Sequence, residues 1–222
     1  MLDFQKYRQA FLEASQSITN EQWNDFANNP FFLWAPELSD IHVQNCTVFC
    51  SRERMLYALP KHAIVAEIGT QYGKFAEKIM LATHPQKLHI IDIDLSLLQA
   101  SLDERTAIKT GLKNHSVELH QGDSSTVIAT FPDQYFDWIY IDGDHSYEGV
   151  KKDIDKSHPK LKENGLLVFN DYTHWSPYEM IPYGIPRAVN EFCITHHWEI
   201  VFLALDSFLT YQDVAIRKIK PA

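Results

Sequence analysis

The residues most able to do chemistry lie in one short segment near the middle of the chain. An apolar run, Trp138–Ile141, is followed directly by Asp142, Gly143, Asp144 and His145. The run has the character of a strand that is buried on both faces. Two carboxylates and an imidazole would therefore lie at the carboxyl end of a central strand, where open α/β sheets bind their ligands. We expect this corner to contain a metal ion and a general base.

A second polar segment follows the next apolar run of the chain. Leu166–Phe169 is typical of a strand, and Asn170 and Asp171 come directly after it. Because parallel strands present their carboxyl ends at the same edge of a sheet, Asp142, Asn170 and Asp171 should lie close together. Carboxylate and amide oxygens suit Mg²⁺ or a similar divalent cation and leave positions open for water and substrate. The alternative is that Asn170 and Asp171 only cap a loop.

His145 and Asp142 are the candidate catalytic residues. An imidazole exchanges its proton near neutral pH, since its reference pKa is about 6.5, and His145 follows Asp142 closely in the sequence. Asp144 is the alternative base. His145 could instead cap a helix that begins near Tyr147, or support a metal ligand from outside the coordination sphere.

A glycine turn, Glu67–Gly73, connects a strand-like run, Ala63–Ile68, to a helical pattern over Lys74–Ala82. Glycine in such a turn lets the backbone approach a ligand closely. Asp92 ends the next strand-like run, where a carboxylate can accept hydrogen bonds from ribose hydroxyls, and Asp94 is the second choice. A turn and an acid in this order are typical of nucleotide-containing cofactors.

Two details of this turn disfavour NAD. Gln71 occupies the middle position, so the turn is not the G-x-G-x-x-G of dinucleotide-binding proteins. Glu67, just before Gly69, would repel a pyrophosphate and suits a cationic amino group instead. An NAD-dependent oxidoreductase is therefore the less favoured alternative.

Strand-like and helical patterns alternate from residue 61 onward. Such alternation predicts an α/β fold, a mostly parallel sheet with helices on both faces. Trp198–Leu205 and Ser207–Ile216 are predicted to form an antiparallel hairpin at its C-terminal end. Residues 1–60 have a different, helical character, so we predict an N-terminal helical cap at 1–60 and one α/β domain at 61–222.

Composition restricts the class of partner. The 222 residues carry a net charge of −9 and three cysteines, with 45% hydrophobic residues. The acidic balance disfavours nucleic acid and anionic membranes, and no apolar run approaches the ~20 residues that span a bilayer. Sparse cysteines and the lack of an export signal lead us to expect a cytoplasmic protein that acts on a small molecule. The N-terminal helices could mediate homo-oligomerisation.

Together, these motifs resemble those of class I S-adenosylmethionine-dependent methyltransferases, which have a Rossmann-like fold. The motifs occur in the family's order: Glu67–Gly73, Asp92, Gly122-Asp123, Asp137–Ile154 and Gly165–Tyr172. The last two are similar to the small metal-dependent O-methyltransferase-like group, methyltransferase family 24, with catechol and macrolide-sugar O-methyltransferases as relatives. The resemblance covers about residues 61–216, and the first 60 residues carry no family signal.

The resemblance implies a set of cofactor-binding residues. Glu67, Gly69, Thr70 and Gly73 would surround the methionine end of S-adenosylmethionine, Asp92 or Asp94 would bind the ribose, Asp123 and Ser124 would lie beside the adenine, and Asp142 would face the amine. Asp123 has an alternative role as a turn-forming or helix-capping residue.

The resemblance also implies an activity, the transfer of a methyl group to a hydroxyl of a small molecule. Mg²⁺ bound by Asp142, Asn170 and Asp171 would orient the acceptor, and His145 occupies the position of the family's general base. The Asn-Asp order is the reverse of the family's. The other class of function is a methyltransferase-like domain that binds a cofactor or partner without catalysis. Aromatic residues could line the acceptor pocket or pack the cap onto the domain: Phe31–Trp34, Tyr172, Trp175, Tyr178 and Tyr183.

Overall fold

The structure is a computed structural model that describes residues 4–16, 19–22, 34–205 and 211–220. Its contacts divide the chain into two compact units, Met1–Trp34 and Ala35–Ala222. The first unit contains helix α1 (Phe4–Gln16). The predicted aromatic segment at 31–33 lies outside the described residues. The second unit thus begins at Ala35 and includes β1, within the range assigned to the N-terminal cap. The domain boundary after residue 60 stays a prediction.

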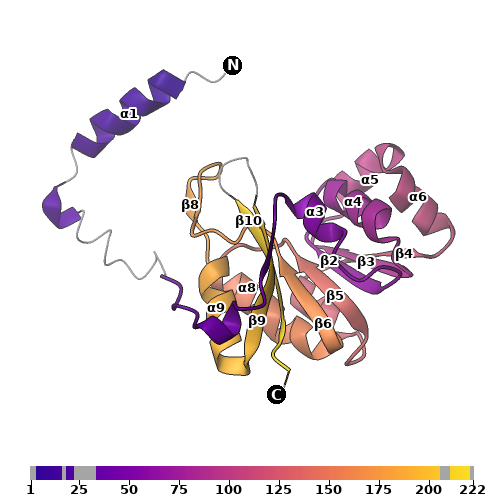
Figure 1. Cartoon of the computed structure of the whole chain (residues 1–222). Coiled ribbons are helices and arrows are strands. Elements are labelled where there is room, and N and C mark those ends of the chain that lie inside the picture. The colour runs from indigo at the N-terminus through magenta and orange to yellow at the C-terminus, as the bar shows by residue number, and fades with distance from the viewer. Residues whose placement is uncertain (1–3, 17–18, 23–33, 206–210, 221–222) are drawn as a thin grey trace. The chain divides into compact units, whose positions relative to one another are not determined.

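The second unit is built on one eight-stranded sheet with the order β1-β9-β10-β6-β5-β2-β3-β4 (Figure 1). Neighbouring strands are parallel except where β10 pairs with β6 and with β9. The strands are β1 (Thr47–Phe49), β2 (Ile64–Ile68), β3 (Lys87–Asp92), β4 (Val117–Gln121), β5 (Phe136–Ile141), β6 (Leu161–Phe169), β9 (Trp198–Leu205) and β10 (Gln212–Lys218). The predicted α/β class, mostly parallel sheet and C-terminal antiparallel pair are confirmed.

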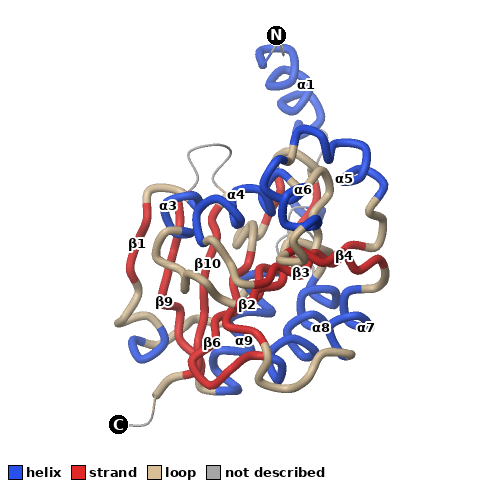
Figure 2. Tube along the Cα trace, turned by 90° about the vertical axis from the view of Figure 1, so that its right-hand side faces the viewer, coloured by secondary structure: helices blue, strands red, loops and turns tan. Residues whose placement is uncertain are grey.

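Helices cover both faces of this sheet, as Figure 2 shows. One apolar layer includes residues of α3 (Arg52–Leu56), α4 (Lys74–Thr83), α5 (Ser96–Ser101) and α6 (Thr106–Lys113). The opposite layer includes residues of α7 (Ser124–Ala129), α8 (Tyr147–Ser157) and α9 (Ile185–His196). Short 3₁₀ helices lie at Asp40–His42, Leu102–Glu104 and His158–Lys160. None of the described helices is both long and apolar enough to cross a bilayer.

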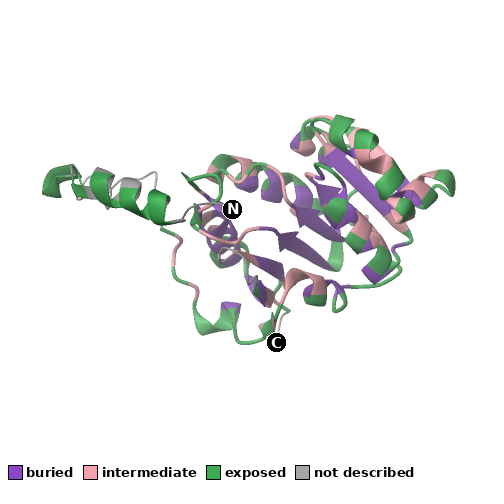
Figure 3. Cartoon of the chain, turned by 90° about the horizontal axis from the view of Figure 1, so that it is seen from above, coloured by how far each residue is buried: buried purple, intermediate pink, exposed green. Residues whose placement is uncertain are grey.

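Strand β5 lies at the centre of both layers. Trp138 and Tyr140 point into one layer, while Ile139 and Ile141 point into the other, and the relative exposure of each is 3% or less. The alternation follows from the two-residue period of a strand. In Figure 3 the strands of the sheet are mostly purple, the colour of buried residues, whereas the helices carry many exposed green residues. The segment after Ile141 therefore starts from a strand that is packed on both faces.

Two details of the sheet differ from the sequence prediction. The short strand β1 was not predicted, and it pairs in parallel with β9 at the edge. Strand β6 begins at Leu161, although the sequence Glu163-Asn-Gly165 predicts a turn. The register shifts at this point, from Phe136↔Leu161 to Trp138↔Leu166, so the polar residues form an irregularity within the strand.

The segment after β6 contains a two-stranded antiparallel sheet, β7 (Trp175–Ser176) with β8 (Ile181–Pro182). Glu179, between these strands, lines the cavity described below.

Candidate active site

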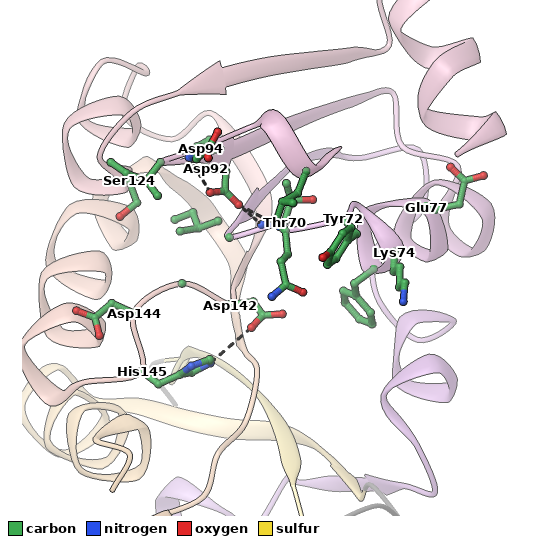
Figure 4. A pocket seen from close by; sticks show the side chains of 18 of the residues that line it. Thr70, Tyr72, Lys74, Glu77, Asp92, Asp94, Ser124, Asp142, Asp144 and His145 are labelled. Carbon is green, nitrogen blue, oxygen red and sulfur yellow. Dashed lines mark hydrogen bonds and ion pairs between the residues drawn. The ribbon is translucent and has the colours of Figure 1, made fainter. Parts of the chain in front are cut away.

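A cavity of about 1100 Å³ lies where β2, β3, β4 and β5 end (Figure 4). The parallel order reverses around β2, because β3 and β4 lie on one side of it and β5 and β6 on the other. Doubly wound sheets bind ligands at such a switch point. The predicted site residues that line the cavity are Gly69, Thr70, Asp92, Asp94, Asp123, Ser124, Asp142, Asp144 and His145. The volume suits a nucleotide-sized cofactor with a small second ligand.

Gly69 allows the ends of β2 and β5 to meet. Its φ is +80°, and an added Cβ would collide with the backbone carbonyl of Asp142. The backbone of Asp142 donates to the carbonyl of Ile68 at 2.7 Å. Gly73 has a φ of +68° and precedes α4, and a Cβ there would collide with Leu98. The glycine turn is therefore required by positive φ and by close packing.

We predict that Gly69→Ala disrupts the site. The added methyl must displace backbone, which costs about 1–3 kcal/mol as overpacking and about 1–2 kcal/mol for the left-handed conformation. Thermal unfolding should show a clear loss of stability. Gly143→Ala is the matched control, because the nearest atom to its Cβ would lie 3.5 Å away. Equal melting temperatures for the two variants would contradict this account.

Asp92 holds the glycine turn in place. Its Oδ2 accepts hydrogen bonds from the backbone N–H groups of Thr70, at 2.7 Å, and Gln71, at 3.0 Å. Asp94 instead serves its own loop, because its carboxylate accepts from the backbone and hydroxyl of Ser96. These hydrogen bonds lower the pKa of Asp94. Of the two acids considered for the ribose, Asp92 is thus the one that is hydrogen-bonded to the glycine turn.

Glu67 is a buried carboxyl beside the turn, with 1% relative exposure. Among the described residues, its Oε2 and Thr70 Oγ1 are two of the four buried side-chain polar atoms that have no hydrogen-bond partner. Burial, with Asp142 and Asp92 nearby, raises the pKa of Glu67 to about 8. Buried polar atoms normally have partners, so this position is suited to a ligand that brings a cation or a donor.

Asp123 caps α7. Its carboxylate accepts hydrogen bonds from Ser125 and from the backbone and side chain of Thr126, and these, with Lys152, lower its pKa strongly. The helix-capping alternative for Asp123 is therefore what the structure shows, although Asp123 also lines the cavity. Ser124 donates to Asp153 at 2.6 Å.

His145 and Asp142 face each other across the loop after β5 (Figure 4). His145 Nε2 lies 3.5 Å from Asp142 Oδ1, and it is a third buried atom without a hydrogen-bond partner. The ring stacks on Tyr183, with centroids 4.4 Å apart. Burial opposes protonation of His145, but Asp142, with Asp171 and Glu179, outweighs it and raises the pKa of His145. Asp144 points away from this pair and accepts from the backbone of Ser146.

Arg52 also lines the cavity, although no motif in the sequence points to it. Its guanidinium donates to Asn170 Oδ1 at 2.8 Å and lies over the Phe75 ring. Burial opposes the charge, yet Tyr140, Asp213 and Asp142 raise the pKa of Arg52 further. A permanent cation is thus placed among the acids of the corner. The segment carried no signal for this role, because Arg52 begins a short helix far from the motifs in sequence.

Arg52 bears directly on the predicted magnesium site. Asn170 Oδ1 accepts from Arg52 and lies 3.1 Å from the Tyr140 hydroxyl, while Asn170 Nδ2 donates to Asp142 Oδ1 at 3.0 Å. A guanidinium can only donate hydrogen bonds, so Arg52 keeps the amide oxygen of Asn170 turned toward itself. Of the three predicted ligands only Asp142 lines the cavity. In this arrangement the donor set does not fit Mg²⁺, whose binding stays a prediction.

Comparisons with known proteins agree on the fold. Residues 66–172 match a family model described as a methyltransferase domain. Comparison with curated protein sequences gave no match. Among solved structures, the chain is similar to the O-methyltransferase TomG of Streptomyces achromogenes, which is involved in tomaymycin synthesis and was solved with S-adenosylmethionine. The identity is 15% and the TM-score 0.57, over 90% of this chain and 98% of that one.

Two further structures share the fold. A methyltransferase from Aquifex aeolicus that depends on S-adenosylmethionine has 16% identity and a TM-score of 0.54, over 75% of this chain and 89% of the other. Spermidine synthase from Thermotoga maritima has 16% identity and a TM-score of 0.52 over 75% of this chain. The chain spans 56% of the length of that synthase. At these identities the likeness concerns the fold.

The sequence motifs, the strand order and the family model lead to one assignment. The match begins at Ala66, in β2, and ends at Tyr172, just after β6, so it contains the glycine turn, Asp92 and the Asp142–His145 corner. The resemblance predicted from the sequence is confirmed at the level of the fold: residues 66–172 match the methyltransferase-domain model, and the chain shares the class I methyltransferase fold with the solved structures.

Proposed function

We propose that this protein transfers a methyl group from S-adenosylmethionine to a hydroxyl group of a small molecule, with His145 as the general base. The observation that carries the proposal is the position of His145, which lines the cavity and whose Nε2 has no hydrogen-bond partner and lies 3.5 Å from Asp142 Oδ1. A neutral imidazole there can accept a proton from an acceptor bound in the cavity.

The cavity is suited to a cationic cofactor. When bound, S-adenosylmethionine supplies an electrophilic methyl group on a positively charged sulfur. Asp92 and Asp142 line the cavity, and Glu67, a buried neighbour of both acids, has an unpartnered oxygen. An ammonium group near Glu67 would favour its carboxylate form. The glycine turn would let the backbone approach the cofactor closely. Gly69 has a positive φ, which favours glycine, so this position carries no side chain.

His145 and Arg52 have different roles toward the acceptor: His145 is the base, and Arg52 provides positive charge. His145 Nε2 takes the proton of the acceptor hydroxyl as its oxygen attacks the methyl group; S-adenosylmethionine, when bound, would supply that methyl and leave as the neutral thioether. Tyr183 holds the imidazole plane by stacking. Arg52 supplies positive charge near the developing oxyanion, a role that a divalent cation was predicted to fill. Oriented charge of this kind contributes to catalysis without reorganisation of solvent.

Methyl transfer can be tested directly. The full chain is incubated with methyl-labelled S-adenosylmethionine and a panel of compounds that carry both hydroxyl and amino groups, catecholamines and amino sugars, in EDTA and in Mg²⁺. The proposal expects label on a hydroxyl oxygen for at least one compound, with similar rates in both buffers. Label on nitrogen alone would overturn the O-methylation proposal. Cofactor binding without label on any compound would favour the non-catalytic alternative.

We predict a rate that rises with pH. His145 must be neutral to accept a proton, and the Asp142 carboxylate raises its pKa above the ordinary 6.5. The value of kcat should therefore fall as pH drops through this raised pKa. Asp142→Asn removes the main raising charge and should move the acidic limb of the profile toward lower pH. A pH-rate profile at saturating cofactor measures the shift, and an unchanged limb in Asp142→Asn would refute the coupling.

We predict that Glu67→Gln stabilises the protein at alkaline pH and weakens cofactor binding. The pKa of Glu67 is raised from 4.5 to about 8 in the folded protein. Stability is therefore greatest at low pH and is lost as pH rises between these values. Glutamine stays neutral, so the melting temperature of the variant relative to wild type should increase from pH 5 to pH 8.5, while affinity for S-adenosylmethionine falls roughly tenfold. Glu163→Gln, an exposed change outside the cavity lining, is the control. A temperature difference independent of pH would contradict the burial argument.

A further inference from the structure

A second cluster of ionisable side chains lies at the β4 edge of the sheet. His89 belongs to β3, and Glu118 and His120 belong to β4. The register places His89 opposite Glu118, and His120 two residues further along the same face. Among the described residues, this is the one group of three or more His, Cys, Asp or Glu side chains whose ligand atoms converge. None of the three lines the cavity.

The three ligand atoms have the spacing of a coordination sphere. His89 Nδ1 lies 3.0 Å from His120 Nε2 and 3.5 Å from Glu118 Oε2, and the last two atoms are 3.9 Å apart. Ligands about 2.0–2.2 Å from a tetrahedral zinc ion are separated by about 3.4 Å. An ion could therefore enter with small adjustments of the side chains.

Neighbouring groups orient His89 for such a role. The ring packs edge-on against Phe131 and Phe136, and its exposure is 2%. His89 Nε2 lies 3.2 Å from the Tyr135 hydroxyl, which can accept its N–H and leave the Nδ1 lone pair for a metal. Burial lowers the pKa of His89 to about 4, so the ring is neutral at physiological pH, as a metal ligand must be.

Lys87 fixes the position of the Glu118 carboxylate by pairing with Oε1, the oxygen that does not face the histidines. Lys87 forms an ion pair with Glu118 Oε1 and also donates to the carbonyl of His115. Glu118 Oε2 remains on the side of the two histidines. The side chains of Glu118 and His120 are 48% and 27% exposed, so solvent can reach the cluster. This opening provides an entry path and room for water as a fourth ligand.

We propose that His89, Glu118 and His120 bind one transition-metal ion, with Zn²⁺ as the best match. Two imidazoles and one carboxylate suit zinc, whereas Mg²⁺ prefers a set made of oxygen ligands. The ion would clamp the edge strand β4 to β3. His89 lies three residues before Asp92, about 10 Å along the strand. The site would therefore stabilise the fold and take no part in methyl transfer.

The test uses the metal alone on the full chain. The protein is stripped with EDTA, desalted, and titrated with ZnCl₂ against a chromogenic chelator, and Co²⁺ is added separately for its visible spectrum. We expect one tightly bound equivalent, the absorption bands of four-coordinate Co²⁺, and a higher melting temperature with Zn²⁺. Mg²⁺ should not compete. Absence of a tight equivalent would overturn the proposal and leave a hydrogen-bonded histidine pair.

Variants then locate the ion. His120→Ala and Glu118→Gln change partly exposed residues and should keep the fold. Each should weaken Zn²⁺ binding more than about 100-fold, since loss of even an outer partner costs about 10–100-fold. His196→Ala, on the far helix α9, and Cys50→Ser are the controls and should bind as wild type does. Wild-type affinity in both His120→Ala and Glu118→Gln would refute the site.

Discussion

Replacing His145 with alanine should reduce kcat by about 10²–10⁴-fold, the usual contribution of a positioned base. Affinity for S-adenosylmethionine should stay within about threefold of wild type, because the proposed cofactor contacts lie at Glu67, Asp92 and the glycine turn. The loss of kcat is expected because His145 lines the cavity and its Nε2 has no hydrogen-bond partner among the described residues. Steady-state kinetics and calorimetric binding measure the two quantities separately.

Asp144→Asn is the matched control for this prediction. Asp144 lies beside His145 in sequence, but its carboxylate accepts from the backbone of Ser146 and points away from Asp142. The variant should keep kcat within about threefold, whereas His145→Gln should behave like His145→Ala. If Asp144→Asn loses turnover and His145→Ala keeps it, the base is Asp144.

Replacing Arg52 with methionine should lower kcat by about 10²–10³-fold, as removal of one oriented donor to a developing oxyanion does. It should also destabilise the protein by about 1.5–3 kcal/mol, because Asn170 Oδ1 loses a hydrogen bond from a charged donor. Kinetics at low temperature, where the variant stays folded, separate the two effects. Arg52→Lys retains the charge without the fork geometry and should recover part of kcat.

Two controls distinguish Arg52 from a magnesium ion. Arg54→Met changes an exposed arginine of the same helix and should leave turnover and stability unchanged. EDTA should leave wild-type turnover unaffected. Loss of activity in EDTA that Mg²⁺ restores would show that Asp142, Asn170 and Asp171 do bind the ion that the sequence predicts.

The parts of the fold that could be predicted are those with a local signal. The apolar run of β5, the glycine turn and Asp92 each follow from residue type and spacing, and all of them meet at the switch point. Asp142 and His145 were found because polar residues abruptly follow a buried strand. The paired β9 and β10 were also readable from their apolar patterns.

The remaining features depend on partners that are distant in sequence. Strand β1 is three residues long, and among the described strands it pairs with β9 alone. The orientation of the Asn170 amide is decided by Arg52, which a pattern around Asn170 cannot reveal. His89 and Glu118 meet only through the register of β3 with β4. These contacts are tertiary, so composition and periodicity carry no trace of them.

The proposed function requires that the cavity at the ends of β2, β3, β4 and β5 binds S-adenosylmethionine. Isothermal titration of the full chain with S-adenosylmethionine in EDTA, beside the same titration with NAD, measures this binding. We expect saturable binding of one S-adenosylmethionine per chain, loss of that binding in Gly69→Ala, and no saturable heat with NAD. Saturation by NAD, or wild-type affinity for S-adenosylmethionine in Gly69→Ala, would contradict it.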